Sequence, residues 1–264
     1  MTRDFTLQTY VRLLEATKKY SIVTVSDFLS GKAVEPFIVL RHDVDKFPAR
    51  AARMAKLENR LGVHATYYFR WDPKLLHVDR GYPSGKEPGG FPASYVLEAK
   101  LYGHEVGYHY ENLSDFKGDK EKALPDFVEK LAALRKIAPV TTAAMHGAPR
   151  SRVRNADMLL GANFKALGLL GEPYISKEFS DLVYVTDSGR RWNSGESSVR
   201  DRLGKPAEER VKSTDALMEL VKAVKYPRLM VSAHPQRWGV GKVEWIVELV
   251  GQNVKNVGKM VLRG

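Results

Sequence analysis

Cysteine is absent from the 264 residues of this chain. Disulfide bonds, thiolate metal sites and cysteine nucleophiles are therefore excluded, and any transition-metal site must use His, Asp, Glu or water. No run of about 18 apolar residues occurs, so no transmembrane helix is expected. Residues 1–20 carry charges throughout and lack the apolar centre of a signal peptide. These two absences predict a cytoplasmic protein.

Basic residues outnumber acidic ones, 42 to 31, which gives a formal net charge of +11. A basic surface attracts nucleic acids, anionic membranes or phosphorylated substrates. The Lys and Arg residues are scattered, without a run of five, so a solvated basic surface is the first interpretation. An anionic small substrate such as a nucleotide sugar is the alternative, and nucleic acid is an unlikely partner.

Apolar and polar segments alternate in the order expected of βα units. An apolar run at 36–40 suits a buried strand, 51–62 suits a helix ended by Gly62, and 64–70 suits a second strand. This order predicts an α/β fold with a parallel sheet in one domain. The long loop at 72–92 is either a lid or a plain surface excursion. Further elements are expected at 5–20 (helix), 93–102 (helix), 105–110 (strand), 124–134 (helix), 139–145 (strand), 174–193 (short strands), from 214 (helix), 228–233 (strand) and from 243 (helix).

Ionisable side chains follow four of the predicted strands. Because the carboxyl ends of parallel strands meet on one face, these residues are expected to converge there. They are His42, Asp43 and Asp45 after the first strand, His109 and Glu111 after the next, then His146, and finally His234.

Asp43 and Asp45 lie two residues apart, so in extended chain both carboxylates point to the same side. Such a pair needs a positive partner, and a divalent cation fits; a polar turn that caps the next helix is the alternative. His104 and His109 are five apart and face opposite sides of a straight strand. His109, at the strand end, is the better ligand, and His104 is expected in the core.

Several further residues near these strand ends have two interpretations each. His234 suits a general acid, because imidazole titrates near neutral pH. Arg150 and Arg237 suit a carboxylate partner or a substrate oxygen, with surface salt bridges as the alternative. Trp192 and Trp238 suit stacking on a sugar ring, although a buried core position is the more common use of tryptophan.

Taken together, these segments resemble the polysaccharide deacetylase superfamily, also called NodB-like or carbohydrate esterase family 4. The family's apolar strand ending in two Asp residues is matched at 38–45, and its GHE(I/V)GxH stretch at 103–109. Two later family motifs are similar to 146–150 and 231–234. The stretches RHDVD at 41–45 and HPQRW at 234–238 look closest to a divergent branch associated with surface-polysaccharide and O-antigen gene sets.

The resemblance implies a deformed (β/α) barrel as a single domain over 1–264, with an N-terminal helical extension at 1–35 and the barrel from about 36 to 264. It also implies a divalent metal, with zinc the expected identity. In this sequence the implied roles are Asp43 as general base, Asp45 and His109 as metal ligands, and His234 as general acid.

One departure concerns the third metal ligand. The family usually has a further His four residues after the first, where this chain has Leu113. His146 is the preferred replacement, and Glu111, His42 or water are alternatives. Arg150 is grouped with the catalytic residues. Glu111, Arg237 and the two tryptophans Trp192 and Trp238 are grouped with the substrate.

The expected activity is metal-dependent hydrolysis of an N-acyl group, acetyl or formyl, on an amino sugar. The expected partner is a carbohydrate substrate, namely an amino sugar, a glycan or a nucleotide sugar. A catalytically inactive carbohydrate-binding homologue is one alternative, because Leu113 interrupts the usual ligand set. Another divalent-metal hydrolase acting on an anionic substrate is the other.

Overall fold

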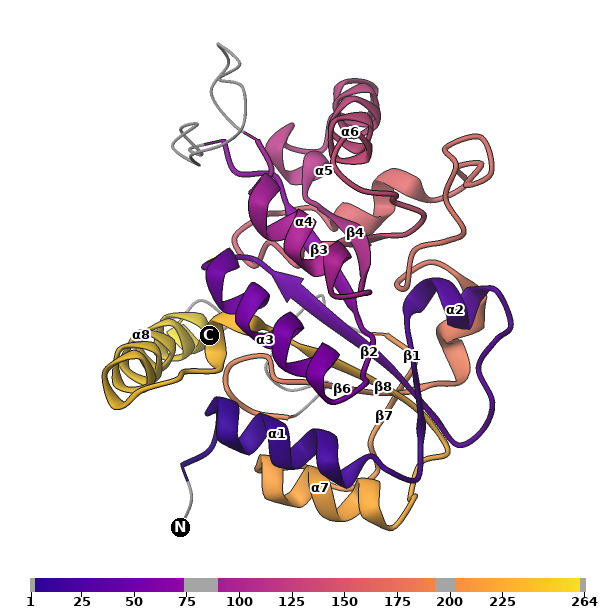
Figure 1. The fold of residues 1–264 in the computed structure, drawn as a ribbon. Coiled ribbons are helices and arrows are strands. Elements are labelled where there is room, and N and C mark those ends of the chain that lie inside the picture. The colour runs from indigo at the N-terminus through magenta and orange to yellow at the C-terminus, as the bar shows by residue number, and fades with distance from the viewer. Residues whose placement is uncertain (1–2, 74–89, 193–202, 262–264) are drawn as a thin grey trace.

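The sheet at the centre of the molecule consists of parallel strands, as the computed structural model in Figure 1 shows. The structure describes residues 3–73, 90–192 and 203–261, the last stretch without its side chains from 252 onward. The strands are β1 Ser21–Val23, β2 Phe37–Val44, β3 Thr66–Arg70, β4 Glu105–Tyr110, β5 Ala143–Met145, β6 Val183–Thr186, β7 Lys205–Pro206 and β8 Arg228–Ala233.

The order across the sheet is β5-β4-β3-β2-β8-β6-β7, and β1 pairs with the first part of β2. Every pairing between these strands is parallel. Within the described residues β5 and β7 do not pair with each other, so the curled sheet stays open. The expected α/β fold of the deformed-barrel type is therefore confirmed.

Helices flank this sheet, and α1 illustrates how the local sequence sets a helix and its buried face. In α1, Tyr10, Leu13 and Leu14 share one buried face, and the Thr6 hydroxyl caps the helix by accepting a hydrogen bond from the backbone N–H of Thr9 at 3.1 Å. Figure 1 places α1 beside α7. The helices are α1 Leu7–Ala16, α2 Val25–Leu29, α3 Pro48–Arg60, α4 Ala93–Leu101, α5 Asn112–Asp115, α6 Lys120–Arg135, α7 Thr214–Lys222 and α8 Lys242–Val261, with short 3-10 turns η1 Asn155–Leu159, η2 Lys177–Asp181 and η3 Pro235–Arg237.

Alternation along β2 decides which side chains reach the interior of the curled sheet. Ile38 and Leu40 belong to the larger hydrophobic core, which lies between the sheet and the helices. Val39 belongs to a second core on the other face of the sheet. With a side-chain period of two, Arg41 and Asp43 continue the face of Val39. The sheet interior therefore carries charged groups toward its carboxyl end.

Several boundaries differ from those expected. The strand expected at 36–40 extends to Val44, so His42 and Asp43 lie inside it rather than after it. The segment 1–35 is not purely helical, because β1 joins the sheet through it. The region 174–193 contains one strand and a 3-10 turn instead of several strands. Most of the loop at 72–92 lies outside the described residues. None of the described helices is long and apolar enough to cross a bilayer.

Candidate metal centre

Asp45, His109 and His146 come together from the carboxyl ends of β2, β4 and β5. One potential ligand atom from each lies within 4.8 Å of the others. Asp45 Oδ1 is 3.2 Å from His109 Nε2 and 3.7 Å from His146 Nε2. These are the three residues that the sequence grouped as metal ligands, and parallel pairing of β2, β3, β4 and β5 brings them together.

Both histidine rings are held from behind by hydrogen-bond acceptors. His109 Nδ1 lies 3.0 Å from the carbonyl oxygen of Ala144, and His146 Nδ1 lies 2.7 Å from Glu111 Oε2. Arg70 donates a hydrogen bond to the other oxygen of Glu111. A proton on each Nδ1 leaves the Nε2 lone pair facing Asp45. This is the arrangement in which a histidine binds a metal ion.

The donor set at this position fits a divalent cation. Asp45 Oδ1 is buried without a hydrogen-bond partner, whereas Oδ2 accepts a hydrogen bond from Gln236 Nε2 at 2.9 Å. Three lone pairs therefore face one another with no proton between them, and a cation relieves that repulsion. One carboxylate and two imidazoles are ligands that zinc and similar transition metals accept.

Ionisation of the three groups agrees with metal binding. Burial alone raises the pKa of Asp45, but His109, His146 and His234 outweigh it and hold that pKa well below its usual range. Burial lowers the pKa of His146, which favours the neutral imidazole. A carboxylate and a neutral imidazole are the forms that coordinate metals.

Asp43 lies beside this cluster with one free oxygen. Arg41 Nη2 donates to Asp43 Oδ2 at 2.6 Å, and the same nitrogen donates to the Tyr174 hydroxyl at 2.8 Å. Burial raises the pKa of Asp43, but the charges of Arg41, His109 and His234 outweigh burial and bring that pKa below its usual value, so the carboxyl is ionised. Asp43 Oδ1 is buried without a hydrogen-bond partner and can accept a proton.

His234 approaches from β8 and is bound by Asp187, a residue that the sequence analysis missed. His234 Nδ1 lies 2.6 Å from Asp187 Oδ1, and His234 Nε2 lies 4.0 Å from Asp45 Oδ2. Burial and Arg237 lower the pKa of His234, but Asp187 and Asp45 raise it above its ordinary value. Asp187 directly follows β6, so it lies at a strand end like the other site residues. The sequence analysis missed it because no single strand was assigned within 174–193.

The two tryptophans that were expected to contact a sugar lie in the core. Trp192 and Trp238 are each only 1% exposed and pack against Phe5. The indole N–H of Trp192 donates to Thr214 Oγ1 at 2.8 Å, and that of Trp238 donates to Asp187 Oδ2 at 3.0 Å. Apolar packing and satisfied N–H groups explain their burial, which leaves no ring face for a sugar.

Three further residues that were expected to act on the substrate have other positions or partners in the structure. Arg237 is buried and donates to the backbone carbonyl of Asp187. Glu111 is engaged by His146 and Arg70, so it supports a histidine instead of facing a sugar. Arg150 is exposed, and no described contact joins it to the cluster.

The alternative ligands point away from the site. His42, on the helix-facing side of β2, lies with Nε2 2.7 Å from Glu58 Oε1 of α3. His104 Nε2 lies 2.8 Å from the carbonyl oxygen of Ala55, so this residue is in the core as expected. Leu113 is a buried core residue on the short helix α5. His146, not Leu113, therefore lies with Asp45 and His109.

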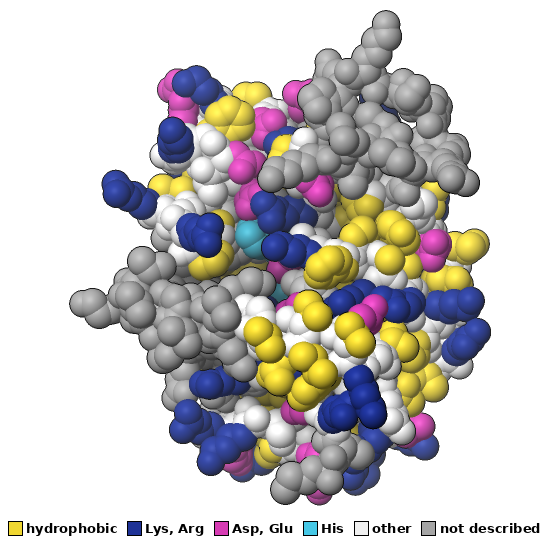
Figure 2. Space-filling view, turned by 90° about the vertical axis from the view of Figure 1, so that its left-hand side faces the viewer, with side chains coloured by type: hydrophobic (Ala, Val, Ile, Leu, Met, Phe, Trp, Pro, Cys, Tyr) yellow, Lys and Arg dark blue, Asp and Glu magenta, His cyan; other side chains and the backbone are white. Residues whose placement is uncertain are grey.

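Figure 2 looks at the molecule from the left-hand side of Figure 1. Histidine side chains are visible near the centre of this face, among basic and acidic side chains. His146 and Asp45 retain partial exposure, each with 18% of the side chain accessible. The cluster is therefore open to solvent on one side, as a substrate site requires.

The solved structures that this chain resembles are family 4 carbohydrate esterases and deacetylases. One is a family 4 esterase from Streptococcus mutans, 12% identical, covering 94% of this chain and 91% of the other, with a TM-score of 0.45. A second is the catalytic domain of a peptidoglycan N-acetylglucosamine deacetylase from Eubacterium rectale, 15% identical over 84% of this chain and 86% of the other, also at 0.45. A third is a family 4 pseudoenzyme from Bacillus anthracis, 12% identical over 83% of this chain and 60% of the other, at 0.41. Neither a family model nor a curated protein sequence matches this chain.

Proposed function

We propose that this protein is a metal-dependent hydrolase that removes an acetyl or formyl group from the nitrogen of an amino sugar or glycan. The observation that carries the proposal is the set Asp45, His109 and His146, with an unpartnered carboxylate oxygen facing two imidazole lone pairs. Asp43 and His234 lie on the borders of this set and supply the base and the acid that amide hydrolysis needs.

Asp45, His109 and His146 would hold the metal, and Glu111 and Ala144 would orient the two rings from behind. When bound, a divalent cation such as zinc supplies Lewis-acid polarisation of the amide carbonyl and a lowered pKa for water. The protein supplies the proton transfers.

Asp43 acts as general base in this proposal. Its free Oδ1 accepts the proton of the attacking water, while Arg41 holds the other oxygen at 2.6 Å and keeps the carboxyl ionised at neutral pH. Arg41 is itself buried between the rings of Tyr68 and Tyr174, so it holds the carboxylate in one position. The base is therefore oriented before the substrate arrives.

His234 acts as general acid. Its raised pKa keeps a proton on the ring, and Asp187 fixes the ring through Nδ1, which leaves the Nε2 proton facing the cluster. Transfer of that proton to the nitrogen as the C–N bond breaks releases a free amino sugar, and the acyl group leaves as a carboxylate.

Metal content, measured by elemental analysis, tests the proposal. Native protein is expected to hold about one divalent metal ion per chain, and Asp45→Ala and His109→Ala variants are expected to lose it. His64→Ala is the control, because His64 is exposed and outside the cluster. Release of acetate or formate from N-acylated amino sugars by the metal-loaded protein follows as the activity assay. Native protein that takes up no zinc, cobalt or nickel would contradict the proposal and favour a carbohydrate-binding protein.

A further inference from the structure

Helix α8 presents a stripe of apolar side chains to solvent. Val243, Ile246, Val247 and Val250 are 74%, 51%, 64% and 57% exposed, and their spacing of three and four residues places them on one side of the helix. Hydrophobic side chains form a patch on the face seen in Figure 2. A contiguous exposed apolar stripe of this kind marks an interaction surface.

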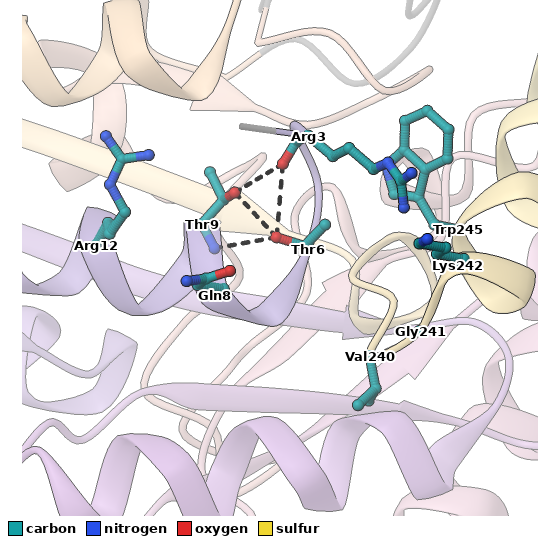
Figure 3. A pocket seen from close by; sticks show the side chains of 9 residues that line it. All are labelled: Arg3, Thr6, Gln8, Thr9, Arg12, Val240, Gly241, Lys242 and Trp245. Atoms are coloured by element: carbon teal, nitrogen blue, oxygen red, sulfur yellow. Dashed lines mark hydrogen bonds between the residues drawn. The ribbon is translucent and has the colours of Figure 1, made fainter. Parts of the chain in front are cut away.

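A basic pocket opens beside the first turn of α8. It has a volume of about 260 Å³ and lies between the start of α1 and the start of α8 (Figure 3). Arg3, Arg12 and Lys242 line it together with Gln8, Val240 and Trp245, and its described lining contains no acidic side chain. The guanidinium of Arg3 lies over the Trp245 ring at 5.6 Å, which holds that cation at the pocket wall.

The positive charge of this pocket is only partly compensated. Arg12 forms an ion pair with Asp215 at 3.2 Å, but both side chains are exposed and such pairs are weak. No carboxylate among the described residues forms an ion pair with Arg3 or Lys242. The nearby Glu244 is occupied by Arg53, at 3.2 Å. The pocket therefore favours a phosphate-like anion.

We propose that this surface docks on an anionic lipid membrane. Headgroup phosphates would enter the pocket of Arg3, Arg12 and Lys242, while the stripe of Val243, Ile246, Val247 and Val250 would lie in the lipid interface. A basic site next to an exposed apolar helix face is the combination that binds anionic membrane surfaces. A second copy of this chain is a poorer occupant, because it brings another net charge of +11 to a face that is already basic.

A series of side-chain contacts connects α8 with the candidate metal centre. Glu244 of α8 is 3.9 Å from Arg50, Arg50 donates a hydrogen bond to the carbonyl of Gln236, and Gln236 donates to Asp45 at 2.9 Å. Docking on a membrane does not require that the metal centre hydrolyses a substrate. Joined to the proposed function, on which this step rests, it directs the metal centre toward amino sugars that are carried on the membrane.

Sedimentation with lipid vesicles tests the proposal on the intact chain. We expect binding to vesicles of equal parts phosphatidylcholine and phosphatidylglycerol, loss of binding to phosphatidylcholine alone, and weakening by salt. Lys242→Glu should weaken binding at least about fivefold, which corresponds to about 1 kcal/mol for one basic side chain at an anionic surface. Val247→Asp should weaken it about tenfold or more, because an apolar side chain can no longer enter the interface.

Two substitutions elsewhere on the surface are matched controls. Leu101→Asp places a carboxylate at another exposed apolar position, and Lys136→Glu makes the same change in net charge away from α8. Both should bind vesicles as the native protein does. Circular dichroism checks that all four variants remain folded.

Three results would overturn the docking proposal. The first is equal binding of native protein and Val247→Asp to the mixed vesicles. The second is binding of inorganic phosphate in the pocket without recruitment to any vesicle, which would identify a site for a soluble anion. The third is a dimer in size-exclusion chromatography that Val247→Asp dissociates, without vesicle binding. Metal content and acyl release are measured separately, so failure of docking and failure of the proposed hydrolysis are distinguishable.

Discussion

Asp187 accepts two hydrogen bonds from His234, one from the ring Nδ1 at 2.6 Å and one from the backbone N–H at 3.0 Å. The two residues follow neighbouring strands, β6 and β8, so the sheet itself sets their separation. Asp187 also accepts a hydrogen bond from the Trp238 indole and is fully buried. A histidine held in this way has one defined ring orientation and one defined tautomer.

Replacement of Asp187 by Asn should therefore impair the acid. The amide can present N–H to Nδ1, which favours the wrong tautomer, and the negative charge that supports the imidazolium is lost. We expect kcat for acyl release to fall by about a hundredfold or more with metal content unchanged. Asp181→Asn is the matched control, because Asp181 is exposed and forms a surface ion pair with Lys205. Unchanged kcat in Asp187→Asn would refute the role of His234 as acid.

Glu111 should act on metal affinity rather than on sugar binding. Its carboxylate accepts the Nδ1 proton of His146 at 2.7 Å. In Glu111→Gln one of the two oxygens is replaced by an NH2 group, which cannot accept that proton. Loss of such a supporting contact typically lowers metal affinity about 10- to 100-fold. Competition with a chelating dye measures this, with the exposed Glu121→Gln as control. A raised KM for sugar at unchanged metal affinity would instead support the substrate role expected from the sequence.

Arg41 and Asp43 form a buried ion pair whose partners depend on each other. Both side chains are almost fully buried, at 0% and 5% exposure. Arg41→Met leaves the Asp43 carboxylate uncompensated, and we expect a loss of about 3–5 kcal/mol in the free energy of unfolding. The double variant Arg41→Met/Asp43→Asn should recover much of that loss, because it removes the unpaired charge. Denaturant titration measures both, and equal destabilisation of the single and double variants would contradict the pairing.

Glu172 should make stability depend on pH. Burial raises its pKa from 4.5 to about 7, although the backbone N–H groups of Met145 and Tyr174 partly oppose this. The folded chain therefore holds this proton more tightly than the unfolded chain. The contribution of Glu172 to stability is retained below pH 4.5 and is lost as the pH rises toward about 7. The whole effect amounts to at most about 3 kcal/mol.

Denaturant titrations at pH values across that window test this expectation. Glu172→Gln, which does not ionise, should show a smaller decrease in unfolding free energy between the acidic and the neutral end than the native chain. Identical pH dependence of the two proteins would show that Glu172 does not titrate in this range. The exposed Glu178→Gln serves as control.

Trp192 should affect stability and leave sugar affinity unchanged. Trp192→Phe removes the hydrogen bond to Thr214 and part of the packing against Trp238, at a cost of about 1–3 kcal/mol. Thermal unfolding measures the loss. KM for the amino sugar is expected to stay at the native value, because the ring is buried; a selective rise in KM would restore the sugar contact that the sequence suggested.

Position at strand ends was a strong predictor, and it failed for Asp187. Asp45 and His146 directly follow β2 and β5, and His109 is the last residue but one of β4, so their convergence could be anticipated from the parallel order alone. Asp187 has the same placement but follows a strand of four residues, Val183–Thr186, in a region where no single strand stood out. Because the sequence analysis assigned no strand end within 174–193, the strand-end rule could not be applied to Asp187.

The direction of each side chain decided which neighbouring candidates face the metal centre and which face the helices. His42 and Asp43 are adjacent in the sequence, yet one faces Glu58 of α3 and the other faces the sheet interior. Their opposite directions follow from the period of two once β2 is known to reach Val44. The strand expected to end at residue 40 left His42 outside it, so the sequence analysis did not assign its side chain to either face.

The sequence by itself determined the parallel α/β fold, the residues available to a metal and the absence of thiol chemistry, because alternating apolar segments and residue types are local properties. Only the tertiary structure decided that His146 lies with Asp45 and His109 while Leu113 is in the core, that Asp187 holds His234, and that Trp192 and Trp238 are buried. Each of these outcomes depends on distances between residues far apart in the chain, which are set by strand pairing and core packing rather than by sequence spacing.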